Sequence, residues 1–137
     1  MNQHIYLRAY MAGVVVPTIF LLVVATVFTI ARYVYNVPVP VERVIVFPMA
    51  VVPNVWGLWN VLFLVWRDRL KLSLGLHGAL LPFLLAPLGI VVTSLLKFSI
   101  PSFAAHVFPV AAPVGLLVYY FAWKYLVGFL NRVVALA

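Results

Sequence analysis

The chain has 137 residues, of which 67% are hydrophobic and 8% are charged, and its mean hydropathy is +1.20. Globular domains are about 45–50% apolar and about 25% charged, so the composition excludes a water-soluble domain. The net charge of +7 does not indicate a nucleic-acid partner, because such binding needs an exposed polar face that this chain cannot build. The absence of cysteine excludes a disulfide framework and a thiolate metal site.

Four stretches without Asp, Glu, Lys or Arg are 23, 23, 25 and 26 residues long. About 20 helical residues, each rising about 1.5 Å, cross the roughly 30 Å of hydrocarbon in a bilayer. The stretches lack the alternation of membrane β-strands. The sequence therefore predicts an all-α integral membrane protein, a four-helix transmembrane bundle forming one domain over residues 1–137. We place the spans at about 9–32, 44–66, 76–97 and 106–128.

The first span, residues 9–32, resembles a signal peptide only in its position. It is too long, and it begins with too little positive charge, for a standard signal peptide. No small-residue cleavage pattern followed by a soluble domain is present. We therefore expect this segment to stay in the mature protein as a membrane helix.

The second span carries unusual residues at its centre, namely Asn54, Trp56, Trp59 and Asn60. Tryptophan usually lies at the membrane interface, and an amide in hydrocarbon is costly unless protein or water surrounds it. At 100° per residue Trp56, Trp59 and Asn60 share about a third of the helix circumference, and Asn54 points nearly the opposite way. We expect protein contacts on both faces, from a central position in the bundle or from a second chain. These residues are candidates for ligand binding or for helix packing through hydrogen bonds.

The basic residues are divided unequally between the two membrane surfaces. Six lie on the side of the two termini and three, Arg32, Arg43 and Lys97, lie on the other side. The positive-inside rule then predicts cytoplasmic N- and C-termini in a membrane of the bacterial inner (plasma) membrane type. Membrane lipids are expected partners, and their headgroups should contact Arg67, Arg69, Lys71, Lys124 and Arg132.

The reactive residues do not form a recognisable catalytic or metal-binding set. His77 and His106 open the third and fourth spans at opposite membrane surfaces, about 30 Å apart, so they cannot share a metal or a haem within one chain. We expect them to be interfacial and to contact water or headgroups. Glu42 and Asp68 stand beside arginines at span edges, and no acid lies inside a span. We therefore expect no metal, no cofactor and no catalytic residue, and we predict that the protein is not an enzyme.

The two halves of the chain resemble each other. Pro17 precedes Arg32 by fifteen residues and Pro82 precedes Lys97 by the same number, while residues 46–50 (VFPMA) match residues 107–111 (VFPVA). The hypothesis is a pair of repeated α-hairpins in parallel orientation, as in some transporters. Chance matching in so apolar a chain is the alternative.

Two functions are compatible with these observations. The first is a non-catalytic helical subunit that packs with itself, as a homo-oligomer, or with a larger membrane complex. The alternative is a small channel or transporter whose oligomer forms a permeation path or ligand pocket near Trp56 and Asn60. The first is favoured because few polar residues lie within the bilayer and none of them is an acid.

Overall fold

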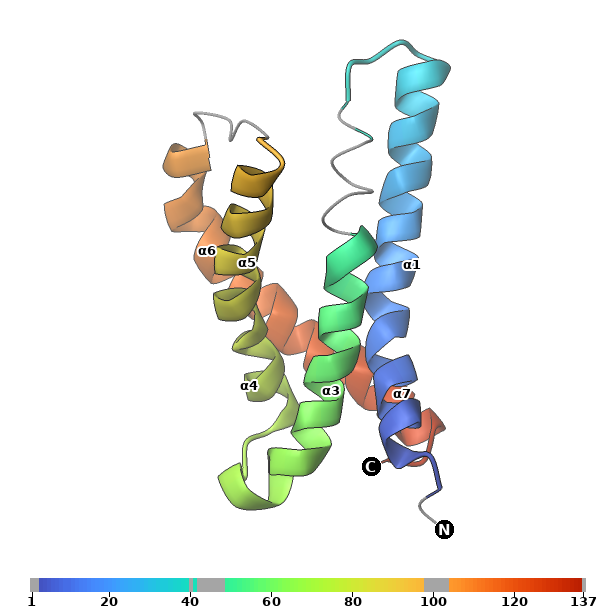
Figure 1. Ribbon diagram of the computed structural model, residues 1–137, viewed down its shortest axis with the longest axis vertical. Helices are drawn as coiled ribbons and strands as arrows, with labels where there is room; N and C mark the ends of the chain where they lie inside the picture. The colour runs from blue at the N-terminus through green and yellow to red at the C-terminus, as the bar shows by residue number, and fades with distance from the viewer. Residues whose placement is uncertain (1–2, 40, 42–48, 98–103, 137) are drawn as a thin grey trace.

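Four helical rods make up the described part of the chain (Figure 1). The computed structural model describes residues 3–39, 41, 49–97 and 104–136. Within these residues there is no strand, and the elements are α1 (Ile5–Tyr33), α3 (Ala50–Leu70), α4 (Leu74–Ala79), α5 (Leu81–Leu95), α6 (Ala104–Phe121), the π-helical segment η2 (Ala122–Val127) and α7 (Gly128–Val133). The third rod is α4 followed by α5, and the fourth is α6, η2 and α7 in continuous succession. The predicted all-α class with four helices is confirmed.

Three of the described helices are long and apolar enough to cross a membrane, namely Ile5–Tyr33, Leu74–Leu95 and His106–Val133. They coincide with the first, third and fourth predicted spans, although the fourth rod continues to Val133 instead of stopping near residue 128. The second predicted span, residues 44–66, corresponds to α3, and its first residues lie outside the described part of the chain. The helix α3 ends beyond this span, at Leu70.

The helices α1 and α3 pack closely against each other. A Cβ atom added at Gly13 would lie 2.6 Å from the backbone oxygen of Trp56, and one added at Gly57 would lie 2.6 Å from the Tyr10 ring. Ala9 and Ala12, on the same helix as Gly13, are also buried. Small residues allow membrane helices to pack closely, because lipid supplies no hydrophobic force to press them together.

The third rod is broken at Leu80, between α4 and α5. Pro82 follows two residues later; it has no N–H to donate to the Gly78 carbonyl, and its ring clashes with that carbonyl in a regular helix. At the other end of α4 the Ser73 hydroxyl accepts a hydrogen bond from the Leu76 N–H at 3.3 Å, which caps the helix. These features make α4 a short helix of its own, distinct from α5.

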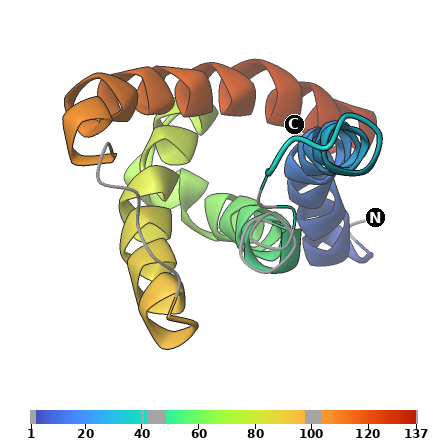
Figure 2. The same cartoon turned by 90° about the horizontal axis from the view of Figure 1, so that it is seen from above.

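The fourth rod runs obliquely behind the other three, and α7 ends near the first turns of α1 (Figures 1 and 2). Its inward side carries Trp123, Val127 and Asn131, all buried and spaced by four residues. In a regular α-helix each four-residue step overshoots the same face by about 40°. The wider turns of η2 reduce this drift, so the three side chains stay on the inward side.

The helix α5 stands apart from α1 and α3 when the molecule is seen from above (Figure 2). Its buried residues are Leu81 and Leu85, both in its first half. The α1–α3 pair is closely packed by contrast, so the two hairpins differ in how tightly their helices meet. The proposed internal repeat stays a prediction, and residues 46–48 of its first motif lie outside the described residues.

The packing around Gly78 provides a first prediction. A Cβ atom at Gly78 would lie 2.0 Å from Cγ of the fully buried Trp123, whereas one at Gly115 would meet nothing within 4 Å. We expect Gly78→Ala to lower the free energy of unfolding by about 3 kcal/mol, the upper end for overpacking. The control Gly115→Ala should be neutral or stabilising by up to about 1 kcal/mol. Thermal unfolding in mild detergent measures both, and equal effects would contradict the packing described here.

Candidate functional site

The four candidate residues of α3 lie in different surroundings. Trp56 and Asn60 are buried, Trp59 is half-buried and Asn54 is exposed. Asn54 contacts α1, Trp56 contacts the fourth rod, and Trp59 contacts the third rod. Asn60 contacts both α1 and α7. The structure therefore does not gather the four residues into one pocket.

Asn60 forms the most buried polar contact of the described chain. Its Nδ2 donates to the Ala9 carbonyl at 2.7 Å and to Asn131 Oδ1 at 2.8 Å, and Asn131 Nδ2 donates back to Asn60 Oδ1 at 3.1 Å. Asn60 has no exposed surface and Asn131 is 3% exposed. The hydrogen bonds of Asn60 connect α3 to α1 and to α7. Both polar atoms of its side chain, Nδ2 and Oδ1, are hydrogen-bonded.

Trp59 and His77 form a second reciprocal pair. Trp59 Nε1 donates to the His77 carbonyl at 2.7 Å, and His77 Nε2 donates to the Trp59 carbonyl at 2.7 Å. The two rings are stacked with centroids 4.7 Å apart. His77 is only 3% exposed, so the expectation that it contacts water or headgroups was wrong. Gly75 and Gly78 on either side explain the burial, because they let α4 approach Tyr120 and Trp123 closely.

An aromatic cluster fills the space between these two polar pairs. The ring centroid of Trp56 lies 5.1 Å from those of Trp123 and Tyr119, and His77 meets Trp123 edge-on at 5.9 Å. Trp123 is fully buried, and its indole N–H has no acceptor in the described part of the chain. The cluster is packed too tightly to hold a ligand between its rings.

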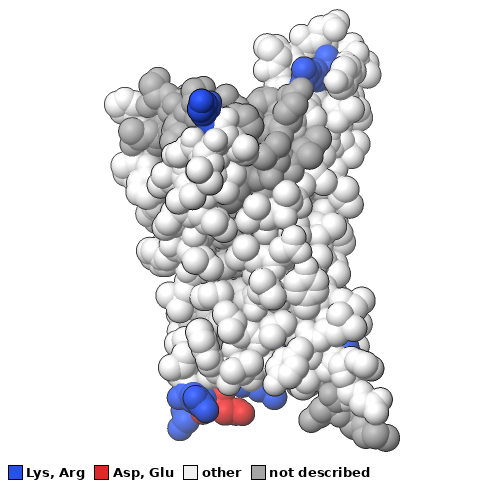
Figure 3. All heavy atoms as spheres, in the orientation of Figure 1, with Lys and Arg blue, Asp and Glu red and all other residues white. Residues whose placement is uncertain are grey.

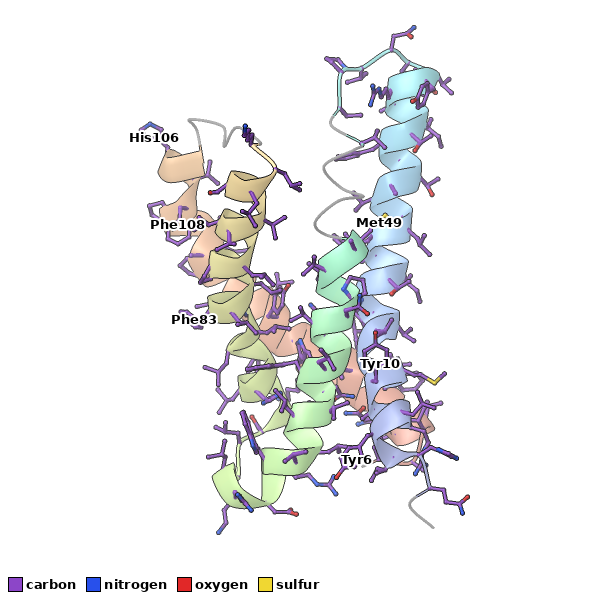
Figure 4. All side chains as sticks on the ribbon, in the orientation of Figure 1. Tyr6, Tyr10, Met49, Phe83, His106 and Phe108 are labelled. Atoms are coloured by element: carbon purple, nitrogen blue, oxygen red, sulfur yellow. The ribbon has the colours of Figure 1, made fainter. Side chains whose placement is uncertain are left out.

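The side-chain amide of Asn54 is hydrogen-bonded on the opposite face of α3. Its Oδ1 accepts a hydrogen bond from the Tyr10 hydroxyl, and its Nδ2 donates to the Ala50 carbonyl at 2.9 Å. Figure 4 shows Tyr10 on α1, beside α3. Both faces of α3 therefore find protein contacts within one chain, and the amides by themselves do not require a second chain.

A lateral groove lies between α1, α3 and the fourth rod. Its volume is about 790 Å³ and its walls are almost entirely apolar, including Val15, Phe20, Trp56, Tyr119, Ala122 and Phe129. Trp56 is the one candidate residue of α3 that reaches this groove, and Asn60 does not line it. The volume lies within the roughly 300–1,000 Å³ of small-molecule pockets in proteins.

The charged residues lie near the two ends of the molecule, with uncharged side chains between them (Figure 3). All five residues predicted to contact headgroups, Arg67, Arg69, Lys71, Lys124 and Arg132, are exposed. Arg67 also donates to the Leu136 carbonyl at 3.1 Å, and Arg8 donates to the Val134 carbonyl at 3.0 Å. These two guanidinium groups connect α1 and α3 to the residues that follow α7.

The other histidines lie apart from His77. His106 is exposed at the end of α6 farthest from the chain termini (Figure 4), and His4 is exposed before α1. Among the described residues no three His, Asp or Glu side chains come together in a way that could hold a metal.

Two buried hydrogen-bonded contacts, those of Asn131 and His77, were not predicted from the sequence. Asn131 lies beyond the predicted end of the fourth span, and His77 was assigned to the membrane surface. The four-residue spacing of Trp123, Val127 and Asn131 is the signal that could have placed Asn131 on a buried stripe. Comparison with protein-family models, with curated proteins and with solved structures finds no match for the chain.

The amide pair generates a second prediction. Asn131→Leu removes one partner of Asn60 and leaves a buried amide group short of hydrogen bonds, which costs about 1–3 kcal/mol. The double variant Asn60→Leu/Asn131→Leu should lose less stability than the two single variants added together, because neither amide is then orphaned. Unfolding by detergent titration in bicelles measures all three variants. Strictly additive losses would show that the two amides do not interact.

The Trp59–His77 pair generates a third prediction. His77→Phe keeps a ring in the stack but removes the donor to the Trp59 carbonyl, so we expect a loss of about 1–3 kcal/mol in the free energy of unfolding. The matched control is His106→Phe at an exposed position, where surface substitutions usually change stability by less than about 0.5 kcal/mol. Thermal unfolding followed by tryptophan fluorescence distinguishes them. A smaller loss for His77→Phe than for the control would refute the buried hydrogen bond.

Proposed function

We propose that the protein is a non-catalytic helical membrane subunit that packs with itself or with a larger membrane complex. The non-catalytic part of the proposal rests on the inward polar groups, which bond to one another within the chain, and the packing part rests on the surface of α5. The amides of Asn60 and Asn131 bond to each other, and Trp59 and His77 bond to each other. A catalytic or ion-binding centre needs polar groups that are free to meet a substrate, and these groups hold helices together instead.

The helix α5 offers the best surface for such packing. Beyond Leu85 it buries no residue within the described chain. Ala86, Gly89 and Thr93 lie within about 60° of one another on its circumference, and small residues of this kind allow a neighbouring helix to approach. The Thr93 hydroxyl already donates within its own helix, to the carbonyls of Gly89 and Ile90, so it can lie at an apolar interface.

The orientation in the membrane belongs to the same proposal. Both termini lie at one end of the molecule (Figure 1), and the larger group of basic residues lies at that end. The positive-inside rule then places this end in the cytoplasm of a membrane of the bacterial inner membrane type.

The channel alternative gains no support from the described residues. Asn60, which was to line a permeation path, has no exposed surface and bonds to Ala9 and Asn131. A water-filled path beside it would have to break these bonds. The geometry therefore favours packing over permeation at this position.

The fourth prediction tests association directly. Native membrane is cut into discs with an amphipathic polymer, without detergent, and the particle mass and its chains are identified by mass spectrometry. We expect two or more copies, or this chain together with another. Ala86→Trp on α5 should reduce the assembled fraction, and the matched control Ala111→Trp, at an exposed position of α6, should not.

A particle holding one copy and no other chain would refute the proposed function. Equal loss of assembly in Ala86→Trp and Ala111→Trp would refute α5 as the contact surface while leaving association itself intact.

A further inference from the structure

One side of α3 is left uncovered by the other described rods. The fourth rod passes behind this helix and α1 lies beside it, so the side away from the fourth rod stays open (Figures 1 and 2). Asn54, Leu58 and Val65 are exposed on this side, and Val61 is half-buried. At 100° per residue these four side chains fall within about 60° of one another. They form a narrow stripe along the helix, which we call the α3 stripe.

The amide of the α3 stripe stands near the middle of the membrane. Asn54 lies thirteen residues before Arg67, or about 20 Å along the helix, and the hydrocarbon core is roughly 30 Å thick. On the face shown in Figure 3, charged side chains lie near the two ends of the molecule. An amide exposed at this depth faces lipid, which offers it no hydrogen bonds. The exposure of Asn54 is therefore costly unless another polar group meets it.

The hydrogen bonds of Asn54 use half of what its amide offers. Its Oδ1 accepts from the Tyr10 hydroxyl, and its Nδ2 donates to the Ala50 carbonyl at 2.9 Å. An amide oxygen has two lone pairs and an amide nitrogen has two hydrogens. Among the described residues, one lone pair and one hydrogen of Asn54 therefore have no partner. A group that completes both must donate and accept at once, as another side-chain amide does.

The buried amides of this chain show such an arrangement. Asn60 Nδ2 donates to the Ala9 carbonyl and to Asn131 Oδ1, and Asn131 Nδ2 donates back to Asn60 Oδ1. Asn60 thus combines one backbone carbonyl with one reciprocal amide. Asn54 already has its backbone carbonyl, that of Ala50, and finds no reciprocal amide in the described part of the chain.

A second copy of the chain presents that amide at the right depth. Two copies inserted in the same orientation are related by a two-fold axis along the membrane normal, so each residue near the axis meets its own copy at equal depth. The α3 stripe also has intervals of four, three and four residues, the spacing at which two parallel helices pack with a left-handed crossing. A different helix would need a polar residue at the same depth, whereas the α3 stripe matches itself by symmetry.

We propose that two copies of the chain associate through the α3 stripe, with the two Asn54 amides paired across a two-fold axis. The apolar residues of the stripe pack against their copies, and the amides fix which residues meet. This inference rests on the proposed function, which it deepens by naming a second copy as a partner. It adds a contact to the α5 surface and does not replace it.

The fifth prediction uses the absence of cysteine from the chain, which makes any introduced thiol unique. Leu58→Cys places a thiol on the α3 stripe, about one turn from Asn54. In the proposed pair, two such cysteines meet within the roughly 4.4–6.8 Å Cα separation that a disulfide spans. Brief oxidation of the full chain in phosphatidylcholine bilayers should therefore give a covalent dimer. The matched control Leu117→Cys, on α6, starts from a residue with the same 58% exposure and should give none.

The role of the amide is tested in the Leu58→Cys background, with disulfide yield followed as lipid dilutes the protein. Asn54→Leu should shift the dilution curve to about tenfold higher protein density, the factor that corresponds to one interhelical hydrogen bond in model peptides. Thr29→Val removes an exposed polar group from α1 and should leave the curve unchanged. Tyr10→Phe removes the hydroxyl that bonds to Asn54 and keeps the amide, so it should also leave the curve unchanged. The comparison of the two cysteine positions keeps the natural amide and stands even if Asn54→Leu does not fold.

Three results would overturn the proposal. Equal crosslinking of Leu58→Cys and Leu117→Cys would reduce the dimer to chance encounters in the bilayer. A dilution curve for Asn54→Leu identical to that for Thr29→Val would show that the amide takes no part in association. Particles from native membrane that hold one copy of this chain together with other chains would replace the second copy by a different partner. The proposed function would then stand while this inference fails.

Discussion

Asn60 has no exposed surface, and each hydrogen bond of its side-chain nitrogen connects α3 to a different part of the chain. In hydrocarbon no water can replace a missing partner, so an amide at this depth must find its acceptors in protein. The Ala9 carbonyl on α1 and the Asn131 amide on α7 provide them. The positions of three rods relative to one another therefore depend on one side chain.

The same requirement explains how the third rod is attached. Trp59 and His77 exchange hydrogen bonds between α3 and α4, and the aromatic cluster around Trp123 fills the space between this pair and the amide pair. The polar atoms lie toward α3 while large apolar side chains cover the outside of the other rods. This division differs from that of a water-soluble bundle, because lipid makes polar contacts, not apolar burial, the specific attraction between helices.

The lateral groove follows from the length of the fourth rod. Residues His106–Val133 exceed the roughly 20 needed to cross a bilayer, and a helix that is too long can tilt to fit. Its tilted course brings α7 against α1 near Arg8, where the Val134 carbonyl is bound, and separates the two helices farther up. The tilt of the fourth rod thus produces the apolar groove between this rod, α1 and α3.

The sequence alone determined the all-α class, the approximate positions of the helices, the basic ends and the unusual centre of the second span. It could do so because the positions of charged residues and the lengths of apolar stretches indicate which residues can lie within a membrane. Helical periodicity also predicted that both sides of α3 would need protein contacts, and Asn54, Trp56 and Asn60 all have them. Only the tertiary structure decided which neighbours these are. Asn60 and Asn131 are 71 residues apart and Trp59 and His77 are 18 apart, and nothing in a one-dimensional pattern selects one polar partner over another. The burial of His77 was likewise undetectable, because it results from the close approach that Gly78 allows to Trp123, a contact between rods that only the packing of the whole bundle creates.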